Sequence, residues 1–210
     1  MASHRLRSHL SFCFIGSRAI FLDRAASRYF LLEDVGAEHM EAFVAGEASE
    51  GAISWLEDRG LIETGAASPA PFMAPSPIAS LHDARLGTPR PWLLAEAMLA
   101  EMRSQRLLTR RSLGSLLDPS RHVGLEADLD RCRPIAAAIE RASRYRDATD
   151  QCLARGLAMR AMLARRGQRA DLVIGVMLPF AAHCWIQSGT TVLSDPLDRV
   201  VNFTPLLTVR

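Results

Sequence analysis

Three residues in the second half of the chain could together form a nucleophilic catalytic site: Cys152, His183 and Asp195. A cysteine becomes an effective nucleophile when a neighbouring base or a helix dipole lowers the pKa of its thiol. A histidine can be that base, and a carboxylate can orient its imidazole. The residue types and their order predict a site with Cys152 as nucleophile, His183 as base and Asp195 as orienting acid.

The sequence around Cys152 predicts that this residue lies near the start of a helix. Thr149 or Asp147 can cap the helix, and the Ala-, Leu- and Met-rich run that follows ends at Arg165-Arg166-Gly167. With Thr149 as the N-cap, Cys152 is the third helical residue, close to unpaired backbone N–H groups and the positive end of the helix dipole. Those N–H groups could stabilise an oxyanion during acyl transfer.

A strand and a hairpin are predicted to bring the other two residues together. Residues 170–178 are typical of a strand, and a hairpin centred on Gly189 follows. Pairing about Gly189 places His183 directly opposite Asp195, with their β-carbons roughly 4.5–5.5 Å apart. The alternation of strand side chains sends Cys184 to the opposite face as a small core residue. A register shift of one residue would reverse this assignment.

These residues also have structural interpretations. Each alone would be typical of a hydrogen-bonded core histidine, a turn aspartate before Pro196, or a buried apolar thiol. A zinc site made of Cys152, His183 and Cys184 is a further alternative, but the chain lacks CxxC and HxxxH pairs. We therefore predict a catalytic site without a metal ion.

The composition indicates a globular chain without obvious nucleic-acid or membrane partners. The chain has 210 residues, 49% of them hydrophobic, so a core can form without disulfides. All 25 basic residues are arginines, and those on predicted helix faces, such as Arg103 and Arg106, indicate solvated surface more than nucleic-acid binding. The four cysteines lack a disulfide-framework spacing, which fits a reducing cytoplasm. No membrane span or secretory signal is predicted.

A proline-rich segment is predicted to divide the chain. Six of the eleven prolines lie between residues 69 and 91, so residues 66–90 are expected to be a linker. The charge balance also changes at this point. Residues 1–65 have 6 arginines and 10 acidic residues, whereas the remainder has 19 and 13. We expect an N-terminal unit over residues 1–65 and a C-terminal unit over residues 91–210.

The N-terminal unit has the pattern of a small winged-helix-like module. Strands are predicted at residues 9–15, 19–23 and 28–32, followed by helices at 34–45 and 49–58. Its acidic balance argues against DNA binding, and an exposed strand edge can bind an extended peptide by β-addition. The alternative is a purely structural cap. The third strand and the second helix would form the peptide groove, lined by Tyr29, Phe30, Leu31, Leu32, Ile53, Trp55 and Leu56.

The C-terminal unit has the element order of an α+β papain-like or transglutaminase-like cysteine peptidase domain. Helices are predicted at residues 91–108 and 124–144, before the Cys152 helix and the strands that carry His183 and Asp195. The chain has no glycine-rich phosphate loop of the Walker or dinucleotide-binding type.

Five short motifs follow one another in this unit. They are Cys152-Leu153, Arg165-Arg166-Gly167, Leu172-Val173-Ile174-Gly175-Val176, Ala182-His183-Cys184-Trp185 and Val192-Leu193-Ser194-Asp195. Together they resemble the B protein of lasso-peptide biosynthesis, over roughly residues 147–207. The first 65 residues resemble, more weakly, the precursor-recognition element of that family. The position of Cys184 departs from the family, which more often has a small residue such as alanine there.

The resemblance implies a leader peptidase fused to a leader-binding module. The module would bind the leader of a ribosomally made precursor peptide, and Cys152 would cleave the leader–core bond with His183 and Asp195. The implied protein partner is an asparagine-synthetase-like lasso cyclase. The cleavage itself would bind no cofactor, and any ATP dependence would act through that cyclase. The alternatives are a cysteine-dependent acyltransferase of the transglutaminase or arylamine acetyltransferase type, and a non-catalytic peptide-delivery adaptor.

Overall fold

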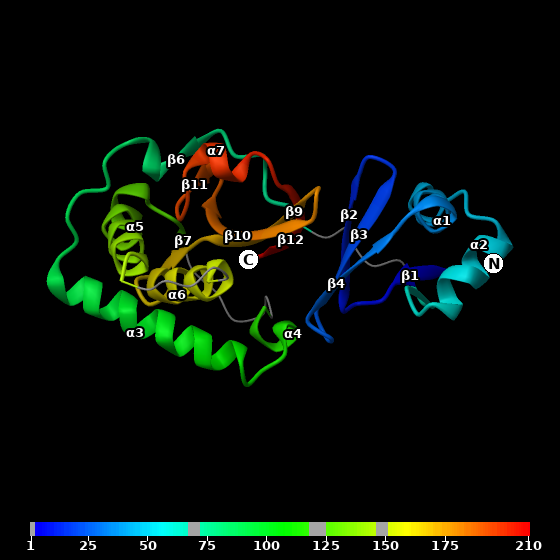
Figure 1. Ribbon diagram of the computed structural model, residues 1–210, viewed down its shortest axis with the longest axis horizontal. Helices are drawn as coiled ribbons and strands as arrows, with labels where there is room; N and C mark the ends of the chain where they lie inside the picture. The colour runs from blue at the N-terminus through cyan, green and yellow to red at the C-terminus, as the bar shows by residue number, and fades with distance from the viewer. Residues whose placement is uncertain (1–2, 67–71, 118–124, 146–150) are drawn as a thin grey trace. The chain divides into compact units, whose positions relative to one another are not determined.

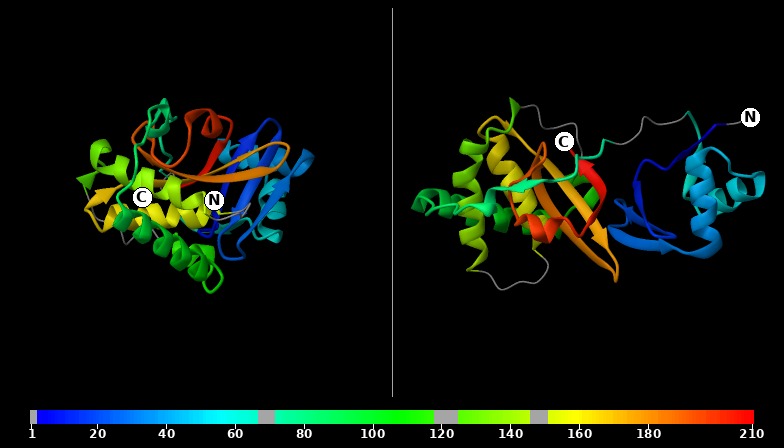
Figure 2. Two further views of the ribbon diagram at one scale, coloured as in Figure 1. Left: turned by 60° about the vertical axis from the view of Figure 1, so that its left-hand side comes forward. Right: turned by 90° about the horizontal axis from the view of Figure 1, so that it is seen from above.

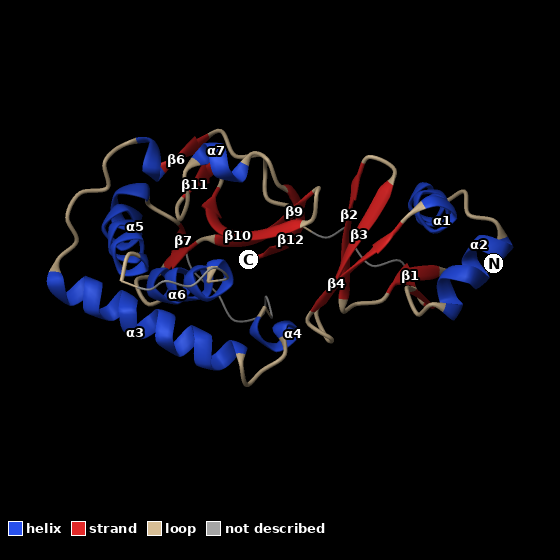
Figure 3. Ribbon diagram, in the orientation of Figure 1, coloured by secondary structure: helices blue, strands red, loops and turns tan. Residues whose placement is uncertain are grey.

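The computed structural model of the chain describes residues 3–66, 72–117, 125–145 and 151–210 (Figure 1). Its contacts divide the chain into two compact units. Unit 1 comprises Met1–Pro71 with Ser112–Gly114, and unit 2 comprises Phe72–Arg111 with Ser115–Arg210. Each unit has its own sheet and its own helices (Figure 3).

Unit 1 is built on an antiparallel three-stranded sheet followed by two helices. The sheet has the order β2 (Leu10–Ile15), β3 (Arg18–Asp23) and β4 (Arg28–Leu32). The helices are α1 (Asp34–Ala45) and α2 (Glu50–Asp58). All five elements were predicted to within one residue, because alternating β-branched and aromatic residues give way to helical spacing at Asp34.

A second, two-stranded sheet joins the two ends of unit 1. β1 (His4–Leu6) pairs antiparallel with β5 (Ile62–Thr64). Sequence analysis did not predict this pair, since three residues carry too little periodicity to indicate a strand. The core of the unit is aromatic: Phe21 is stacked between Phe12, at 5.6 Å, and Phe30, at 4.8 Å between ring centroids.

Unit 2 is built on a mixed five-stranded sheet in the order β12-β9-β10-β11-β6. The strands are β6 (Ala79–Ser80), β9 (Asp171–Met177), β10 (Ala181–Ser188), β11 (Thr191–Val192) and β12 (Thr204–Val209). Neighbouring strands are antiparallel except for β11 and β6. Nearly all of β9 is buried, as expected for a central strand that is covered on both faces.

Three helices gather on one side of this sheet (Figures 1 and 2). α6 (Cys152–Ala164) packs against β9 and β10, while α3 (Pro91–Leu108) and α5 (Leu129–Ser143) pack against α6. The smaller elements are η1 (Leu81–Asp83), α4 (Leu113–Leu116), α7 (Leu197–Val200), β7 (Leu125–Glu126) and its parallel partner β8 (Gln168–Arg169). No helix among the described residues has the length and apolarity to cross a membrane.

A close approach between α6 and β10 fixes which face of β10 meets the helix. A β-carbon built at Gly156 would lie 3.0 Å from the Cys184 sulfur and 3.8 Å from Ile186 Cδ1. Cys184 is therefore buried under α6, as the strand alternation predicted. The opposite face of the sheet carries a separate apolar cluster that includes Val173, Trp185 and Val200.

The predicted linker over residues 66–90 is wrong from residue 72 onward. The Ala74 N–H donates to Thr208 Oγ1 at 3.0 Å, and Gln187 Nε2 donates to the Pro75 carbonyl at 2.6 Å. β6 then extends the sheet of unit 2 at its edge. Pro75 and Pro77 do not prevent this, because they precede a two-residue edge strand and interrupt no central one. Residues 67–71 lie outside the described residues.

The predicted helix over residues 124–144 begins later than expected. α5 starts at Leu129, and the Asp128 side chain caps it by accepting hydrogen bonds from the N–H groups of Asp130 and Arg131. Asp128 is a typical N-cap residue, and it was overlooked because the apolar pattern continues on its N-terminal side. Residue 124 lies outside the described residues.

Candidate active site

Cys152 is the first residue of α6, and Gln151 is the N-cap. The expected position as third helical residue is therefore wrong, and the proposed caps Thr149 and Asp147 lie outside the described residues. The correction keeps the thiol at the N-terminal end of the helix, where backbone N–H groups have no helical acceptor. The Cys152 sulfur accepts hydrogen bonds from the N–H groups of Leu153 and Cys184, and it is hydrogen-bonded to the His183 side chain.

The His183 side chain is held from its other side by a buried aspartate. His183 Nε2 lies 3.0 Å from Asp195 Oδ1, and the two residues are 6% and 4% exposed. Because Asp195 occupies Nε2, the imidazole has Nδ1 left for the Cys152 thiol. The structure thus brings together the three residues that were predicted to form the site.

The predicted register of the hairpin is wrong by one residue. Gln187 pairs with Val192 rather than with Thr191, so the turn contains two residues and Gly189 adopts a φ of 53°. His183 and Asp195 are consequently not cross-strand partners. β11 ends at Val192, and Asp195 lies beyond the strand.

Side-chain hydrogen bonds replace the strand ladder where β11 ends. The Ile186 N–H donates to Ser194 Oγ at 2.9 Å, and the Ser194 hydroxyl donates to Asp195 Oδ2 at 2.6 Å. N–H groups two residues apart point to the same side of a strand, so the Cys184 N–H that binds the Cys152 sulfur belongs to this same open edge of β10. The edge therefore positions both the nucleophile and the orienting acid.

Ser80 ties the edge strand β6 to the orienting acid. Its hydroxyl donates to the Asp195 carbonyl oxygen at 2.6 Å and accepts the His82 N–H. Asp83 completes a capping box by accepting the Ser80 N–H at 2.7 Å. Sequence analysis missed Ser80 and Ser194. The Ser80-x-x-Asp83 pattern is a capping-box signature, but nothing local links it to a residue 115 positions away.

Aromatic rings flank the catalytic imidazole on the sheet face away from α6. The His183 ring centroid lies 5.4 Å from that of Phe203 and 6.3 Å from that of Trp185. Gly175 leaves room for this arrangement, because a β-carbon there would lie 2.7 Å from the Trp185 ring. Trp185 is fixed in turn by donating from Nε1 to Gln187 Oε1 at 2.9 Å.

The electrostatics of the site favour a thiolate beside an imidazolium. Burial raises the pKa of Cys152, but the hydrogen bond and charge of His183 outweigh it, and the net pKa lies below the ordinary value. Burial lowers the pKa of His183, yet the bonds to Asp195 and Cys152 raise it to about 9. Burial likewise raises the pKa of Asp195, and the bond to His183 reverses this and lowers it.

The other three cysteines have the opposite electrostatic environment. Burial raises the pKa of Cys13 and of Cys132 to about 11. Burial also raises the pKa of Cys184 well above its ordinary value, and the nearby charge of Cys152 adds to this effect. Cys184 is therefore a core thiol, although it is adjacent to His183 in sequence. In the part of the chain that the structure describes, no group of three or more His, Cys, Asp or Glu side chains is arranged to hold a metal ion.

The residues of the predicted peptide groove lie on both faces of β4 and on α2. Phe30 and Leu32 face the core, and Ile53 and Trp55 pack against the same core. Leu31 points away and is 40% exposed, and Tyr29 is half-buried. Among the described residues no strand pairs with the outer edge of β4, which leaves that edge open to an added strand.

Leu56 does not line a groove, contrary to prediction. It is fully buried in the core of unit 1, beside Met40 and Phe21. Its position on the inner face of α2 follows from helical spacing relative to Ala52, which is also buried.

A cysteine activated by a His–Asp pair at the start of a helix defines the class of cysteine-dependent peptidases and acyltransferases. The profile of the Transglutaminase-like superfamily matches residues 93–208, which is more than half of the chain and includes Cys152, His183 and Asp195. The chain belongs to this superfamily, whose members are typically cysteine-dependent enzymes. No curated protein and no solved structure matches the chain significantly.

We predict that iodoacetamide alkylates Cys152 selectively at pH 7. The raised pKa of half-buried Cys13, about 11, leaves roughly one thiol in ten thousand as thiolate at that pH, whereas Cys152 has the lowered pKa. Peptide mass spectrometry after timed alkylation measures the four rates. His183→Ala should slow the Cys152 reaction because it removes the hydrogen bond and the charge. Equal labelling of Cys13 and Cys152 in the folded protein would contradict the assignment.

We predict that Ser194→Ala slows Cys152 alkylation at pH 7 by about ten- to a hundredfold. The change removes a hydrogen bond to a charged carboxylate, so Asp195 supports the imidazolium less well. Ser194→Thr keeps the hydroxyl and should restore most of the rate. Ser143→Ala is the matched control, because its hydroxyl bonds only a carbonyl of α5. An unchanged rate in Ser194→Ala would make Ser194 a structural residue without influence on the triad.

Proposed function

We propose that the chain is a leader peptidase of lasso-peptide maturation. Unit 1 binds the leader of a ribosomally made precursor, and Cys152 of unit 2 cleaves the leader–core bond. The observation that carries this proposal is the arrangement of Cys152, His183 and Asp195 in a chain that also has a separate unit with an open strand edge.

The triad geometry supports a two-step hydrolysis. The Cys152 thiolate attacks the carbonyl carbon of the scissile peptide bond, and backbone N–H groups at the start of α6 face the developing oxyanion. His183 then gives its Nδ1 proton to the leaving amine, which releases the core peptide and leaves a thioester between Cys152 and the leader. Water attacks the thioester with His183 as base, and the leader carboxylate departs while Asp195 holds the imidazole.

β-Addition to β4 supports recognition of an extended leader. The backbone of the leader would pair with the outer edge of β4, and its alternate side chains would contact Tyr29 and Leu31 on one face or Phe30 and Leu32 on the other. Phe30 and Leu32 pack against the core. On that face the leader would therefore contact only the accessible parts of these side chains, beside Ile53 and Trp55.

The reaction sequence places an ATP-using, asparagine-synthetase-like cyclase after this enzyme. Cleavage exposes the amino group of the core peptide, which must then be joined to an activated carboxylate to close a macrolactam. The triad needs neither a metal ion nor a bound cofactor for its own step. In this proposal the enzyme acts in the cytoplasm on a peptide, without nucleic acid or membrane.

Transfer of the acyl group to an amine is the alternative that membership of the Transglutaminase-like superfamily favours. Hydrolase and transferase share the same thioester, and they differ only in whether water or an amine accepts the acyl group. An amine trap such as glycine methyl ester in the cleavage assay distinguishes them: a leader amide that dominates at millimolar amine supports transfer, and a free leader carboxylate supports hydrolysis.

We predict that the full chain cleaves the precursor peptide encoded beside its gene, as measured by mass spectrometry. Cys152→Ala and His183→Ala should each reduce the rate by several powers of ten, and the double variant should be no worse, because the two act as one unit. Activity should fall as pH rises through about 9, since His183 then loses the proton that the leaving amine needs. Cys184→Ala is the matched control and should cleave nearly normally. Leader binding without cleavage by the unmodified chain would support an adaptor instead.

We predict that one of two adjacent proline substitutions in β4 abolishes leader binding without unfolding the chain. N–H groups of successive residues point to opposite sides of a strand. One of the two substitutions, Phe30→Pro or Leu31→Pro, therefore removes a hydrogen bond to β3, and the other removes an N–H donor from the outer edge of β4. Calorimetry of each variant in the Cys152→Ala chain with a synthetic leader measures the effect, and circular dichroism checks folding. Leu31→Ala should be mild. Normal binding by both proline variants would exclude β4 as the docking edge.

A further inference from the structure

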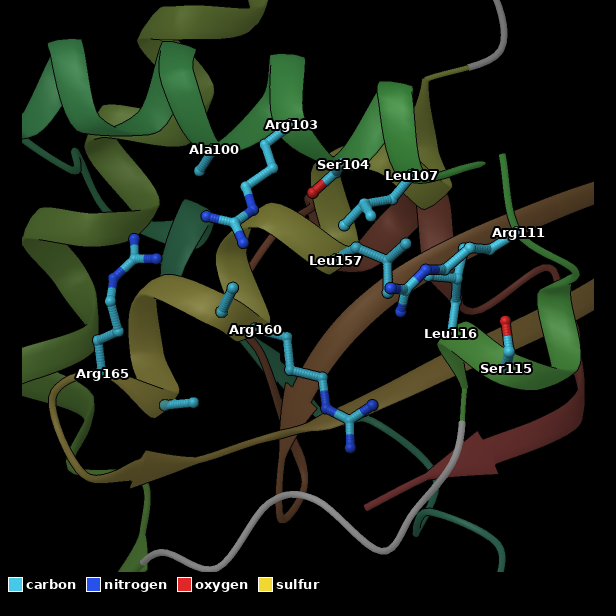
Figure 4. Close-up of a pocket in the computed structure, with 12 residues that line it drawn as sticks. Ala100, Arg103, Ser104, Leu107, Arg111, Ser115, Leu116, Leu157, Arg160 and Arg165 are labelled. Atoms are coloured by element: carbon cyan, nitrogen blue, oxygen red, sulfur yellow. The ribbon is translucent and has the colours of Figure 1, made fainter. Parts of the chain in front are cut away.

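A cavity of about 410 Å³ lies in unit 2 on the half of α6 that is distant from Cys152 (Figure 4). It lies among the C-terminal half of α3, the C-terminal half of α6 and the short helix α4. Its apolar wall includes Leu107 of α3 and Leu157 and Ala161 of α6. The proposed catalytic cycle uses none of the residues that line it.

Four arginines line the cavity, and no carboxylate does. They are Arg103, Arg111, Arg160 and Arg165. Figure 4 shows the Arg103 side chain running from α3 toward α6, and the Arg111 side chain turning back from just beyond the end of α3. Arg165 is held by Glu96 at 2.7 Å, whereas Arg103 and Arg111 form no ion pair within the part of the chain that the structure describes. The cavity therefore concentrates positive charge.

Arg160 is the buried arginine of this group, and Figure 4 shows its side chain running away from those of Arg103 and Arg165. It is 3% exposed, and its Nε is fully buried without a hydrogen-bond partner among the described residues. One Nη donates to the backbone carbonyl of Arg210, and Asp171 is the carboxylate that acts on it electrostatically. A buried guanidinium is costly unless negative charge and hydrogen-bond acceptors compensate it, and Asp171 and the Arg210 carbonyl do so in part.

We propose that this cavity binds a small, multiply charged oxyanion. The guanidinium groups of Arg103 and Arg111 would bind it directly, because such groups make paired hydrogen bonds to phosphate and carboxylate oxygens alike. Arg165, which is paired with Glu96, also lines the cavity, and the buried Ser104 offers a hydroxyl. The apolar wall leaves room for a carbon skeleton behind the charged group. This site is independent of the proposed function, since it involves neither the triad nor β4.

Calorimetry of the full chain with pyrophosphate and with citrate tests the site, at constant ionic strength set with sodium chloride. We expect saturable binding of at least one of the two probes, which also distinguishes phosphate from carboxylate chemistry. Arg103→Gln and Arg111→Gln should each weaken binding by at least about tenfold. Arg106→Gln should bind normally, because Arg106 is exposed like Arg103 and Arg111 but does not line the cavity. Absence of saturable heat with both probes, or equal loss in all three variants, would overturn the proposal.

Arginine footprinting on the unmodified protein provides the second measurement. Phenylglyoxal modifies exposed guanidinium groups, and peptide mass spectrometry gives the rate at each arginine. The probe that binds should protect Arg103 and Arg111 while Arg106 continues to react at its original rate. Saturable heat without protection of Arg103 and Arg111 would place the anion elsewhere and would also overturn the proposal.

Discussion

The early end of β11 is the constraint on which the candidate active site depends. Because β11 pairs with β10 over two residues only, the edge of β10 beside His183 keeps N–H groups that a longer strand would have consumed. The Cys184 N–H binds the Cys152 sulfur, and the Ile186 N–H binds Ser194 Oγ. If β11 continued along β10, its backbone would satisfy the same N–H groups. Cys152 and Ser194 would then have no hydrogen bond to β10, the strand that carries His183.

The buried polar groups of the site compensate one another as a chain of hydrogen bonds. Each of Cys152, His183 and Asp195 loses hydration on burial, and in each case a specific partner outweighs that loss. Ser194 binds the carboxylate oxygen that His183 leaves free, and Ser80 binds the backbone carbonyl of Asp195. A network of this kind stabilises buried charge only while every member is present. Removing a distant residue such as Ser80 should therefore affect the whole site.

Sequence reasoning succeeded where a local pattern has one structural solution. The three-stranded sheet and two helices of unit 1, the helix at Pro91–Leu108 and the burial of Cys184 all follow from apolar periodicity. The register of the β10–β11 hairpin was missed because a turn of two residues and one of three both fit Gly189. β6 was missed because a two-residue parallel strand is specified by a distant neighbour, and the prolines around it indicate a linker more strongly. Cys152, His183 and Asp195 nevertheless lie together as expected, since residue type and order constrain them more than register does.

The pairing of β6 with β11 means that a force on the segment leading into unit 2 would reach the candidate active site. The chain first enters unit 2 at Phe72 and reaches the sheet at β6, so a force applied at Phe72 is borne first by the Ala74 and Pro75 hydrogen bonds and then by this two-residue strand. Ser80, at the end of that strand, is the residue that holds the Asp195 carbonyl. A force applied at Phe72 would therefore loosen the support of Asp195 before it disturbed α6, the helix that begins at Cys152.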